Sequence, residues 1–71
     1  MSLRKRSITL GGHRTSIALE EPFWAVLDRW AASEGRSLAG LIAEIDTKRA
    51  GEQPLASALR VAALTFVQRR S

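Results

Sequence analysis

Arg14-Thr15-Ser16-Ile17-Ala18-Leu19 is the stretch of the sequence that decides the fold. Its residues alternate in character, and a period of two places successive side chains on opposite faces of a β-strand. The odd-numbered residues form an apolar face that begins with a Thr, and the even-numbered residues carry a guanidinium, a hydroxyl and a methyl group. A single strand leaves backbone N–H and C=O groups unpaired. This strand therefore needs a partner, either elsewhere in the chain or in a second copy of it.

The size and composition of the chain narrow the class of protein. Its 71 residues make at most one small domain, and such a short chain usually needs a cross-link or a partner to complete its core. It has no Cys and a single His, His13, which excludes disulfides and argues against a metal site. No apolar run approaches the roughly 18 residues of a membrane span, and no signal peptide is visible. We expect a soluble, cytoplasmic protein without a metal or cofactor.

Positive charge is concentrated at the start of the chain. The formal net charge is +4, and residues 1–19 contain four basic and no acidic side chains, whereas residues 20–71 contain seven of each. This asymmetry indicates a surface that faces a polyanion, although Arg4-Lys5-Arg6 alone also fits a solvated basic tail or a basic membrane binder. The helical segments lack the basic polar face expected of an interfacial membrane helix. The sequence therefore favours nucleic acid.

The residues before the organising strand have two interpretations. Ser7-Ile8-Thr9-Leu10 also alternates, and Gly11-Gly12-His13 interrupts the pattern. Two alternating runs around Gly-Gly can form a hairpin; alternatively, the first run is a flexible arm that lies on DNA. We treat residues 1–13 as a basic N-terminal arm or a weakly ordered extra strand, and His13 as a turn residue or the neighbour of a phosphate.

A first helix is expected after Glu20-Glu21-Pro22. Pro is favoured in the first turn of a helix, and Glu side chains complement its positive N-terminus, although no Ser, Thr, Asp or Asn stands at the N-cap. A stripe of apolar side chains at three- and four-residue spacing predicts the buried face. The stripe consists of Phe23, Val26, Leu27, Trp30 and Ala31, with Trp24 at its edge. We expect both Trp side chains in the core rather than stacked on bases, and Gly35 as the C-terminal cap.

A second helix is expected from the N-cap Ser37 to about Arg49 or Ala50, ending at Gly51. Its apolar face consists of Leu38, Leu41, Ile42 and Ile45. The free N–H groups at its N-terminus, beside Arg36 and the Ser37 hydroxyl, could hold a phosphate, or they could simply be capped.

A third helix is expected after the linker at residues 51–54. Its apolar face consists of Leu55, Ala58, Leu59, Ala62 and Phe66, with Ala63 and Val67 beside it. The acidic residues of the chain lie on helix surfaces or at helix ends, and neither a glycine-rich phosphate loop nor a nucleophile elbow is present. The protein is therefore not expected to be an enzyme.

A basic strand, a helix, a glycine-containing turn and a second helix stand in this order over residues 14–50. In this the chain resembles the ribbon-helix-helix family of Arc/MetJ type, whose members read DNA with a β-ribbon. Its motifs are similar to those of a subgroup of small bacterial ribbon-helix-helix proteins, over nearly the whole chain. These motifs are Lys5-Arg6-Ser7-Ile8-Thr9-Leu10, Gly12-His13-Arg14-Thr15-Ser16, Ser37-Leu38, Ala43-Glu44-Ile45-Asp46 and Ser57-Ala58-Leu59-Arg60.

The resemblance implies a mainly α fold with one short β-strand. Two chains would pair their strands into a two-stranded antiparallel ribbon and intertwine their helices as a homodimer, with a C-terminal third helix added. The domains would be a basic arm or extra strand at 1–13, a ribbon-helix-helix domain at 14–50 and a helical extension at 51–71. The third helix could pack on its own dimer, join dimers into higher oligomers on DNA, or bind another protein.

The resemblance also implies the roles of individual residues on double-stranded DNA. The residues expected to contact bases in the major groove are Arg14, Ser16 and Ala18, of which Ala18 departs from the polar residue often found there. Those expected to contact phosphates are Arg4, Lys5, Arg6, His13, Arg36, Ser37 and Leu38. Those expected in the dimer core are Ile17, Leu19, Phe23, Leu27, Trp30, Leu41, Ile42 and Ile45.

Two functions follow from these expectations. The first is a sequence-specific DNA-binding transcriptional regulator that acts as a repressor. The alternative is an antitoxin-like interaction module that binds a partner protein, for instance a toxin, through the apolar stripe Leu55, Leu59 and Phe66 of its C-terminal helix.

Overall fold

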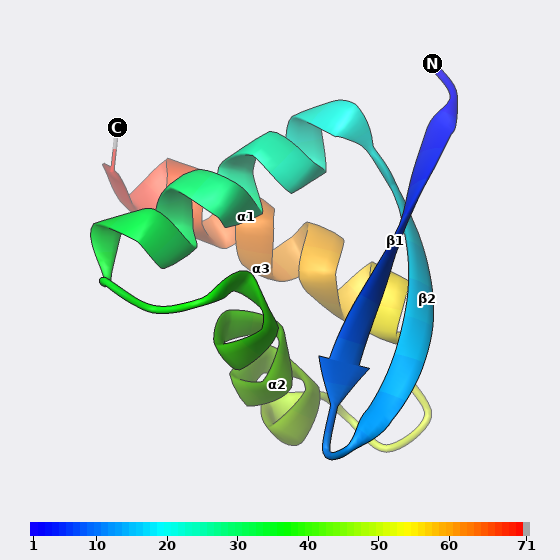
Figure 1. Cartoon of the computed structure of the whole chain (residues 1–71). Helices are drawn as coiled ribbons and strands as arrows, with labels where there is room; N and C mark the ends of the chain where they lie inside the picture. The colour runs from blue at the N-terminus through cyan, green and yellow to red at the C-terminus, as the bar shows by residue number, and fades with distance from the viewer. Residues whose placement is uncertain (71) are drawn as a thin grey trace.

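The computed structural model describes residues 1–70. Ser71, the end of the predicted helical extension, lies outside the described residues. The elements are β1 (Leu3–Leu10), β2 (His13–Glu20), α1 (Glu21–Ser33), α2 (Leu38–Lys48) and α3 (Leu55–Arg70). Figure 1 shows the two strands as a hairpin along one side of the molecule, with the helices beside it. The fold is mainly α, as expected, but it contains two strands of eight residues where one short strand was predicted.

The partner of β2 is β1 of the same chain. The two strands are antiparallel and pair over their whole length, from Leu3 opposite Glu20 to Leu10 opposite His13. Gly11 and Gly12 form the turn between them, with φ angles of 56° and 84°. Positive φ at both central residues is the requirement of a type I′ turn, whose twist matches that of the flanking strands. Residues 4–10 are therefore part of a strand, and the pairing that the resemblance assigns to a second chain occurs within one chain.

The two ends of α1 differ in how their backbone groups are capped. Glu20 is the N-cap of α1 and makes no side-chain capping bond. At the other end Gly35 has a φ of 65°, and the N–H groups of Gly35 and Arg36 donate to the carbonyls of Ala32 and Ala31 at 3.1 Å. This is a Schellman motif, which requires the left-handed conformation that Gly adopts without strain.

Ser37 caps α2 as predicted. Its Oγ accepts a hydrogen bond from the backbone N–H of Gly40 at 3.0 Å. A Cβ on Gly40 would lie 3.2 Å from this oxygen, so the glycine leaves room for the cap. The helix ends at Lys48, one or two residues before the predicted end, because Arg49 adopts an extended backbone conformation with a ψ of 153°.

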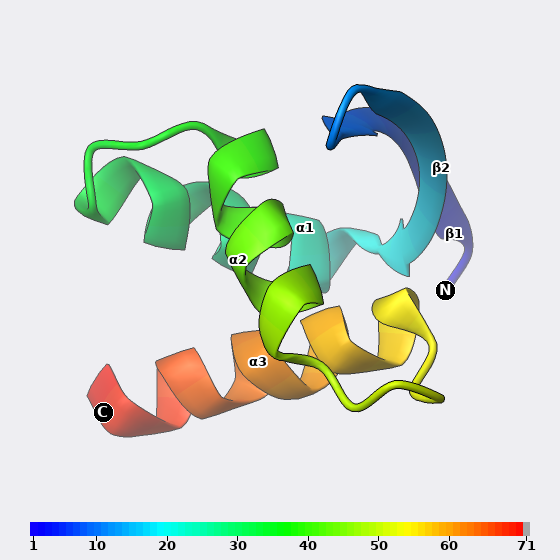
Figure 2. The same ribbon diagram turned by 90° about the horizontal axis from the view of Figure 1, so that it is seen from below.

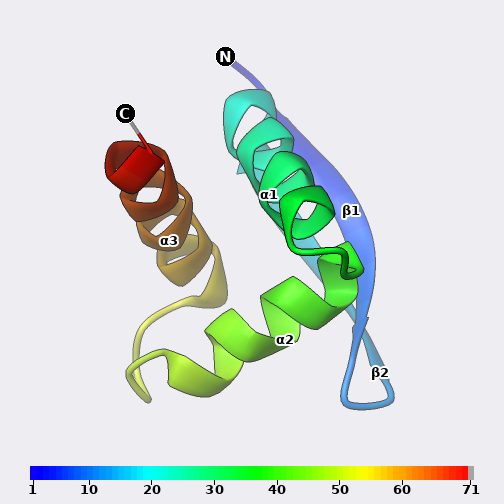
Figure 3. The same ribbon diagram turned by 90° about the vertical axis from the view of Figure 1, so that its left-hand side faces the viewer.

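Every strand and helix of the single chain contributes to one buried core. The largest fully buried side chains come from β2 and from all three helices: Leu19, Trp24, Leu27, Leu41, Ile42 and Leu59. Ile8 of β1 is also buried, and the indole Nε1 of Trp24 donates to the carbonyl of Arg4 at 2.8 Å. Figures 2 and 3 show α2 running across α1 and α3, while the first turn of α3 reaches the hairpin at β2.

None of the helices among residues 1–70 has the length and apolar character needed to cross a membrane.

Candidate nucleic-acid interface

The hairpin has one face on the helices and one face in solvent. The register places Ser7 opposite Ser16 and Thr9 opposite Arg14, while the alternate positions Ile8 and Ile17 are buried. Six residues of the solvent side form what we call the outer ribbon face: Lys5, Ser7, Thr9, Arg14, Ser16 and Ala18. All except the half-buried Ala18 are exposed. The three residues predicted to contact bases therefore lie together on this surface.

Two of the six residues of the outer ribbon face were missed in the sequence. Ser7 and Thr9 stand in β1 directly beside the predicted base-contact residues, but neither was assigned to the site. The alternation of Ser7-Ile8-Thr9-Leu10 before two glycines indicates a second strand of a hairpin. The same segment also fits a flexible arm, and only the conformation of the turn decides between the two.

The cations of the outer ribbon face have no carboxylate partner. Six acidic residues form ion pairs within the chain: Glu20, Glu21, Asp28, Glu34, Glu44 and Asp46. Within residues 1–70, the basic residues left without an ion pair are Lys5, Arg14, Arg29, Arg69 and Arg70. Two of these five lie on the outer ribbon face, so the positive potential of this surface is not neutralised by the protein itself.

Arg4 and Arg6 point to the other side of β1, toward α1. Arg4 forms an ion pair with Glu21 at 2.9 Å. Arg6 donates to both carboxylate oxygens of Asp28 at 3.0 and 3.1 Å, and its guanidinium lies 4.7 Å from the centre of the Trp24 ring. The hydrogen bond to Asp28 raises the pKa of Arg6 above its usual value. These two arginines hold β1 against α1, and of the basic triplet Lys5 alone faces outward.

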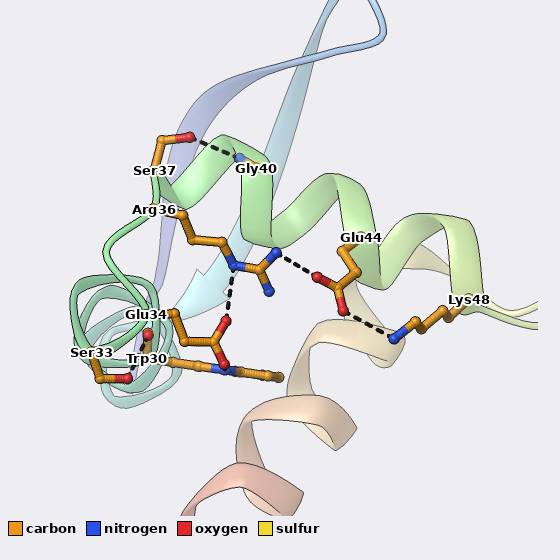
Figure 4. A network of polar contacts seen from close by, with 8 residues as sticks. All are labelled: Trp30, Ser33, Glu34, Arg36, Ser37, Gly40, Glu44 and Lys48. Carbon is orange, nitrogen blue, oxygen red and sulfur yellow. Dashed lines mark hydrogen bonds and ion pairs between the residues drawn. The ribbon is translucent and has the colours of Figure 1, made fainter.

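The start of α2 carries the remaining predicted phosphate contacts. Arg36 forms ion pairs with Glu34, at 3.0 Å, and with Glu44, and Lys48 pairs with the same Glu44 at 2.9 Å (Figure 4). The hydrogen bonds from Lys48 and Arg36 lower the pKa of Glu44. Arg36 is therefore paired with two carboxylates, one at the end of α1 and one on α2. Ser37 is exposed and Leu38 is half-buried at the start of α2, an element that contacts β1.

The other predicted residues occupy two different environments. His13 is exposed at the start of β2, immediately after the turn. The residues predicted for the dimer core lie in the core of one chain. Ile17, Leu19, Leu27, Leu41 and Ile42 are buried, and Phe23, Trp30 and Ile45 pack against them. In the part of the chain described, no three His, Asp or Glu side chains come together where they could hold a metal ion.

Comparison with known protein families identifies the family of the chain. Residues 3–67 match the family model of the ribbon-helix-helix domain. No curated protein matches the chain, and no solved structure matches it either. The match spans both strands and most of α3, so it includes the extra strand and the third helix as well as the strand-helix-helix unit. The chain therefore belongs to the ribbon-helix-helix domain family, whose members are DNA-binding transcription regulators rather than enzymes.

Proposed function

We propose that the protein is a sequence-specific transcriptional repressor that inserts its β1–β2 hairpin into the major groove of DNA. The observation that carries the proposal is the outer ribbon face, which combines two unpaired cations with three hydroxyl groups. The major groove of B-DNA is wide enough to admit a two-stranded ribbon. In this protein both strands of the ribbon would come from one chain.

The side chains of the outer ribbon face suit different contacts in the groove. Arg14 can donate two hydrogen bonds to O6 and N7 of a guanine, and Ser16 can donate to or accept from a base edge. Ala18 offers apolar contact to a thymine methyl group and so discriminates weakly. Ser7 and Thr9, opposite Ser16 and Arg14, extend the set of donors and acceptors to the second strand.

Phosphate contacts would fix the ribbon in the groove without reading sequence. Lys5 and His13 lie on exposed positions near the two ends of the hairpin, and the N-terminus of α2 at Ser37 and Leu38 is an anion-binding position by its dipole and free N–H groups. Arg4, Arg6 and Arg36 would first have to leave their carboxylate partners. We therefore assign these three to positioning β1 and α2.

We further propose that two copies bind together on an operator of two half-sites. Support comes from the family, whose members typically bind DNA as dimers. A dimer doubles the number of base contacts and matches the symmetry of a palindromic site. Since each chain buries its own core, the two copies would meet by surface contact rather than by intertwining.

The proposal is tested by titrating the protein against labelled genomic duplexes by fluorescence anisotropy at several salt concentrations. A few fragments should stay bound near physiological salt while the rest dissociate, because phosphate contacts weaken as salt rises. Arg14→Ala with Ser16→Ala should abolish this selectivity and leave the fold unchanged. Arg29→Gln, which removes a charge on the other side of the molecule, is the matched control. Uniform binding of all fragments, or an unaffected Arg14/Ser16 variant, would refute the mechanism.

A second function is favoured by a separate surface of α3. The stripe predicted to hold a partner is used within the chain, since Leu59 is fully buried and Phe66 stacks on Trp30 at 4.8 Å between ring centres. On the opposite side, Val61 and Leu64 are 57% and 55% exposed. An antitoxin-like contact would have to use this side. A partner encoded next to the gene should then bind the protein and lose binding with Val61→Asp and Leu64→Asp, and equal binding by that variant would exclude it.

A further inference from the structure

A cavity opens between α1 and α3 on the side of the molecule away from the hairpin. Its volume is about 390 Å³, and it is lined by Arg29, Ser33, Phe66, Val67 and Arg70. Arg29 and Ser33 are four residues apart on α1, as are Phe66 and Arg70 on α3, so each pair shares one helix face. Figures 1 and 2 show the C-terminal ends of both helices on the side opposite the strands. The volume lies within the range of about 300–1,000 Å³ of small-molecule sites.

The cavity brings two unpaired cations to one place. Neither Arg29 nor Arg70 has an ion pair with any of residues 1–70. The carboxylate of Glu34, at the end of α1, is occupied by the Nε1 of Trp30 at 2.9 Å and by Arg36 at 3.0 Å. The Ser33 hydroxyl already donates to the carbonyl of Trp30 at 2.8 Å. The donors left for a ligand are therefore the two guanidinium groups, which favour an anion with two oxygens.

An aromatic surface lies next to these cations. The rings of Phe66 and Trp30 are stacked, with centres 4.8 Å apart and an angle of 15° between their planes, and the guanidinium of Arg70 lies 4.6 Å from the centre of Phe66. A second cavity of about 520 Å³ shares Phe66 and Arg70 and adds Trp30, Arg69 and the carboxylate of Glu34, which is already paired with Arg36. A ligand with a flat or apolar body could cover the aromatic wall while its anionic group meets the arginines.

The position of Arg29 is not explained by helix stability. Arg69 and Arg70 stand in the last turn of α3, where any cation offsets the negative end of the helix dipole. Arg29 lies before the last turn of α1, which contains no basic residue. The convergence of Arg29 with Arg70 on one aromatic-walled cavity calls for another role.

We propose that the α1–α3 cavity binds a small amphipathic anion, an apolar or aromatic body that carries a carboxylate or phosphate group. Arg29 and Arg70 bind the anionic group, and Phe66 with Val67 contacts the apolar body. The outer ribbon face belongs to other elements on the other side of the molecule, so this ligand and DNA have separate sites. The inference does not depend on the proposed DNA-binding function.

The experiment uses the isotope-labelled full chain and two-dimensional proton–nitrogen NMR. Naphthyl phosphate and naphthoate serve as anionic probes, and naphthalenemethanol is the neutral probe of the same shape. We expect saturable shifts of the amide signals of Arg29, Ser33, Phe66, Val67 and Arg70 with at least one anionic probe. Comparison of the two anions then identifies the preferred head group. Naphthalenemethanol should bind at least about tenfold more weakly, because a charge-assisted hydrogen bond contributes the equivalent of tenfold or more in affinity.

Substitutions separate this site from general charge effects and from DNA binding. Arg29→Gln should weaken the anionic probe about tenfold, with amide signals outside the cavity unchanged. Arg14→Gln, which removes the same charge from the outer ribbon face, should leave the probe affinity unchanged. In the DNA titration the two variants should behave in the opposite way, so that failure of one site is distinguishable from failure of the other. Equal binding of naphthalenemethanol, or equal effects of Arg29→Gln and Arg14→Gln on the probe, would overturn the proposal.

Discussion

At the scale of single residues, Trp24 is the side chain that ties the N-terminal strand to the helices. It is fully buried, its Nε1 donates to the carbonyl of Arg4 in β1, and the guanidinium of Arg6 lies over its ring. The helical pattern alone placed it at the edge of the apolar stripe, because the stripe describes contacts with other helices. Its hydrogen bond and the cation over its ring both come from β1, which the helical pattern of α1 cannot reveal.

This role predicts different effects for the two Trp side chains. Trp24→Phe should lower the free energy of unfolding by about 2 kcal/mol, because it leaves a void in the core and removes a hydrogen bond to a strand carbonyl. Trp30→Phe should cost less than about 1 kcal/mol, since Trp30 is half-buried and its Nε1 bonds to the exposed Glu34. Urea denaturation followed by circular dichroism measures both. Equal losses would mean that the Trp24–Arg4 bond contributes nothing to stability.

Glu20 gives the fold a pH-dependent contact between β2 and α3. Its carboxylate accepts hydrogen bonds from Arg60 at 2.9 and 3.4 Å, and these bonds lower the pKa of Glu20. A carboxyl group whose pKa is lower in the folded state stabilises the fold fully above its unfolded pKa, about 4.3. This contribution is lost as the pH falls through the lower folded value.

The pH dependence of a Glu20→Gln variant tests this linkage. The variant should unfold at lower urea concentration than the parent near neutral pH. The difference should begin to shrink as the pH falls below the unfolded pKa of about 4.3 and should vanish below the lower folded pKa of Glu20, where both chains carry a neutral group. Glu52→Gln is the matched control, because Glu52 forms no ion pair within residues 1–70. A difference between Glu20→Gln and the parent that stays constant with pH would show that the lost charge is not its cause.

At the scale of elements, the features that could be predicted are those that a few neighbouring residues determine. Gly35 ends α1 in the left-handed conformation and Ser37 caps α2, both as the sequence indicated. The pairing of β2 could not be assigned, because alternation in residues 14–19 is the same whether the partner strand comes from this chain or from another. Arg4 and Arg6 were expected on DNA, but alternation in β1 directs them to α1 while Lys5 faces outward.

The hairpin turn makes a prediction about Gly12. Its φ of 84° is one that residues with a Cβ adopt with strain, and a Cβ there would meet no atom within 4 Å. Gly12→Ala should therefore destabilise the protein by about 1–2 kcal/mol through backbone strain alone. Gly51→Ala is the control, since Gly51 is not among the glycines with positive φ and has equal space around it. Urea midpoints measure both, and an equal effect of the two substitutions would argue against the type I′ turn.

The packing of α3 makes a prediction about its two sides. Leu59 is fully buried, whereas Leu64 is 55% exposed. Leu59→Ala should cost about 2–5 kcal/mol, and Leu64→Ala should change stability by less than about 0.5 kcal/mol. Thermal and urea unfolding distinguish them. If Leu59→Ala were as mild as Leu64→Ala, α3 would not be part of the chain's own core, and its inner stripe would again be available to a partner protein.

At the scale of the whole molecule, β1 and α3 supply two things that a short strand-helix-helix unit lacks: a partner for its strand and additional side chains for its core. β1 supplies the hydrogen-bonding partner of β2, and α3 adds Ala58, Leu59 and Ala63 to the buried core. Within one chain, β2 is thereby paired along one edge, and every strand and helix contributes to the buried core. In the proposed dimer of self-contained chains, assembly and folding would be separable, which is not possible when two chains share one core.

This separation predicts how the protein responds to concentration. The urea midpoint of the free protein should not change over a hundredfold range of concentration, because unfolding of a self-contained chain does not require dissociation. Sedimentation of the protein with a selected DNA fragment should nevertheless give two copies per operator, as the proposed mode of binding requires. A midpoint that rises with protein concentration would mean that folding is coupled to dimerisation, and that β2 or α3 has exchanged its partner in this chain for the same element of a second copy.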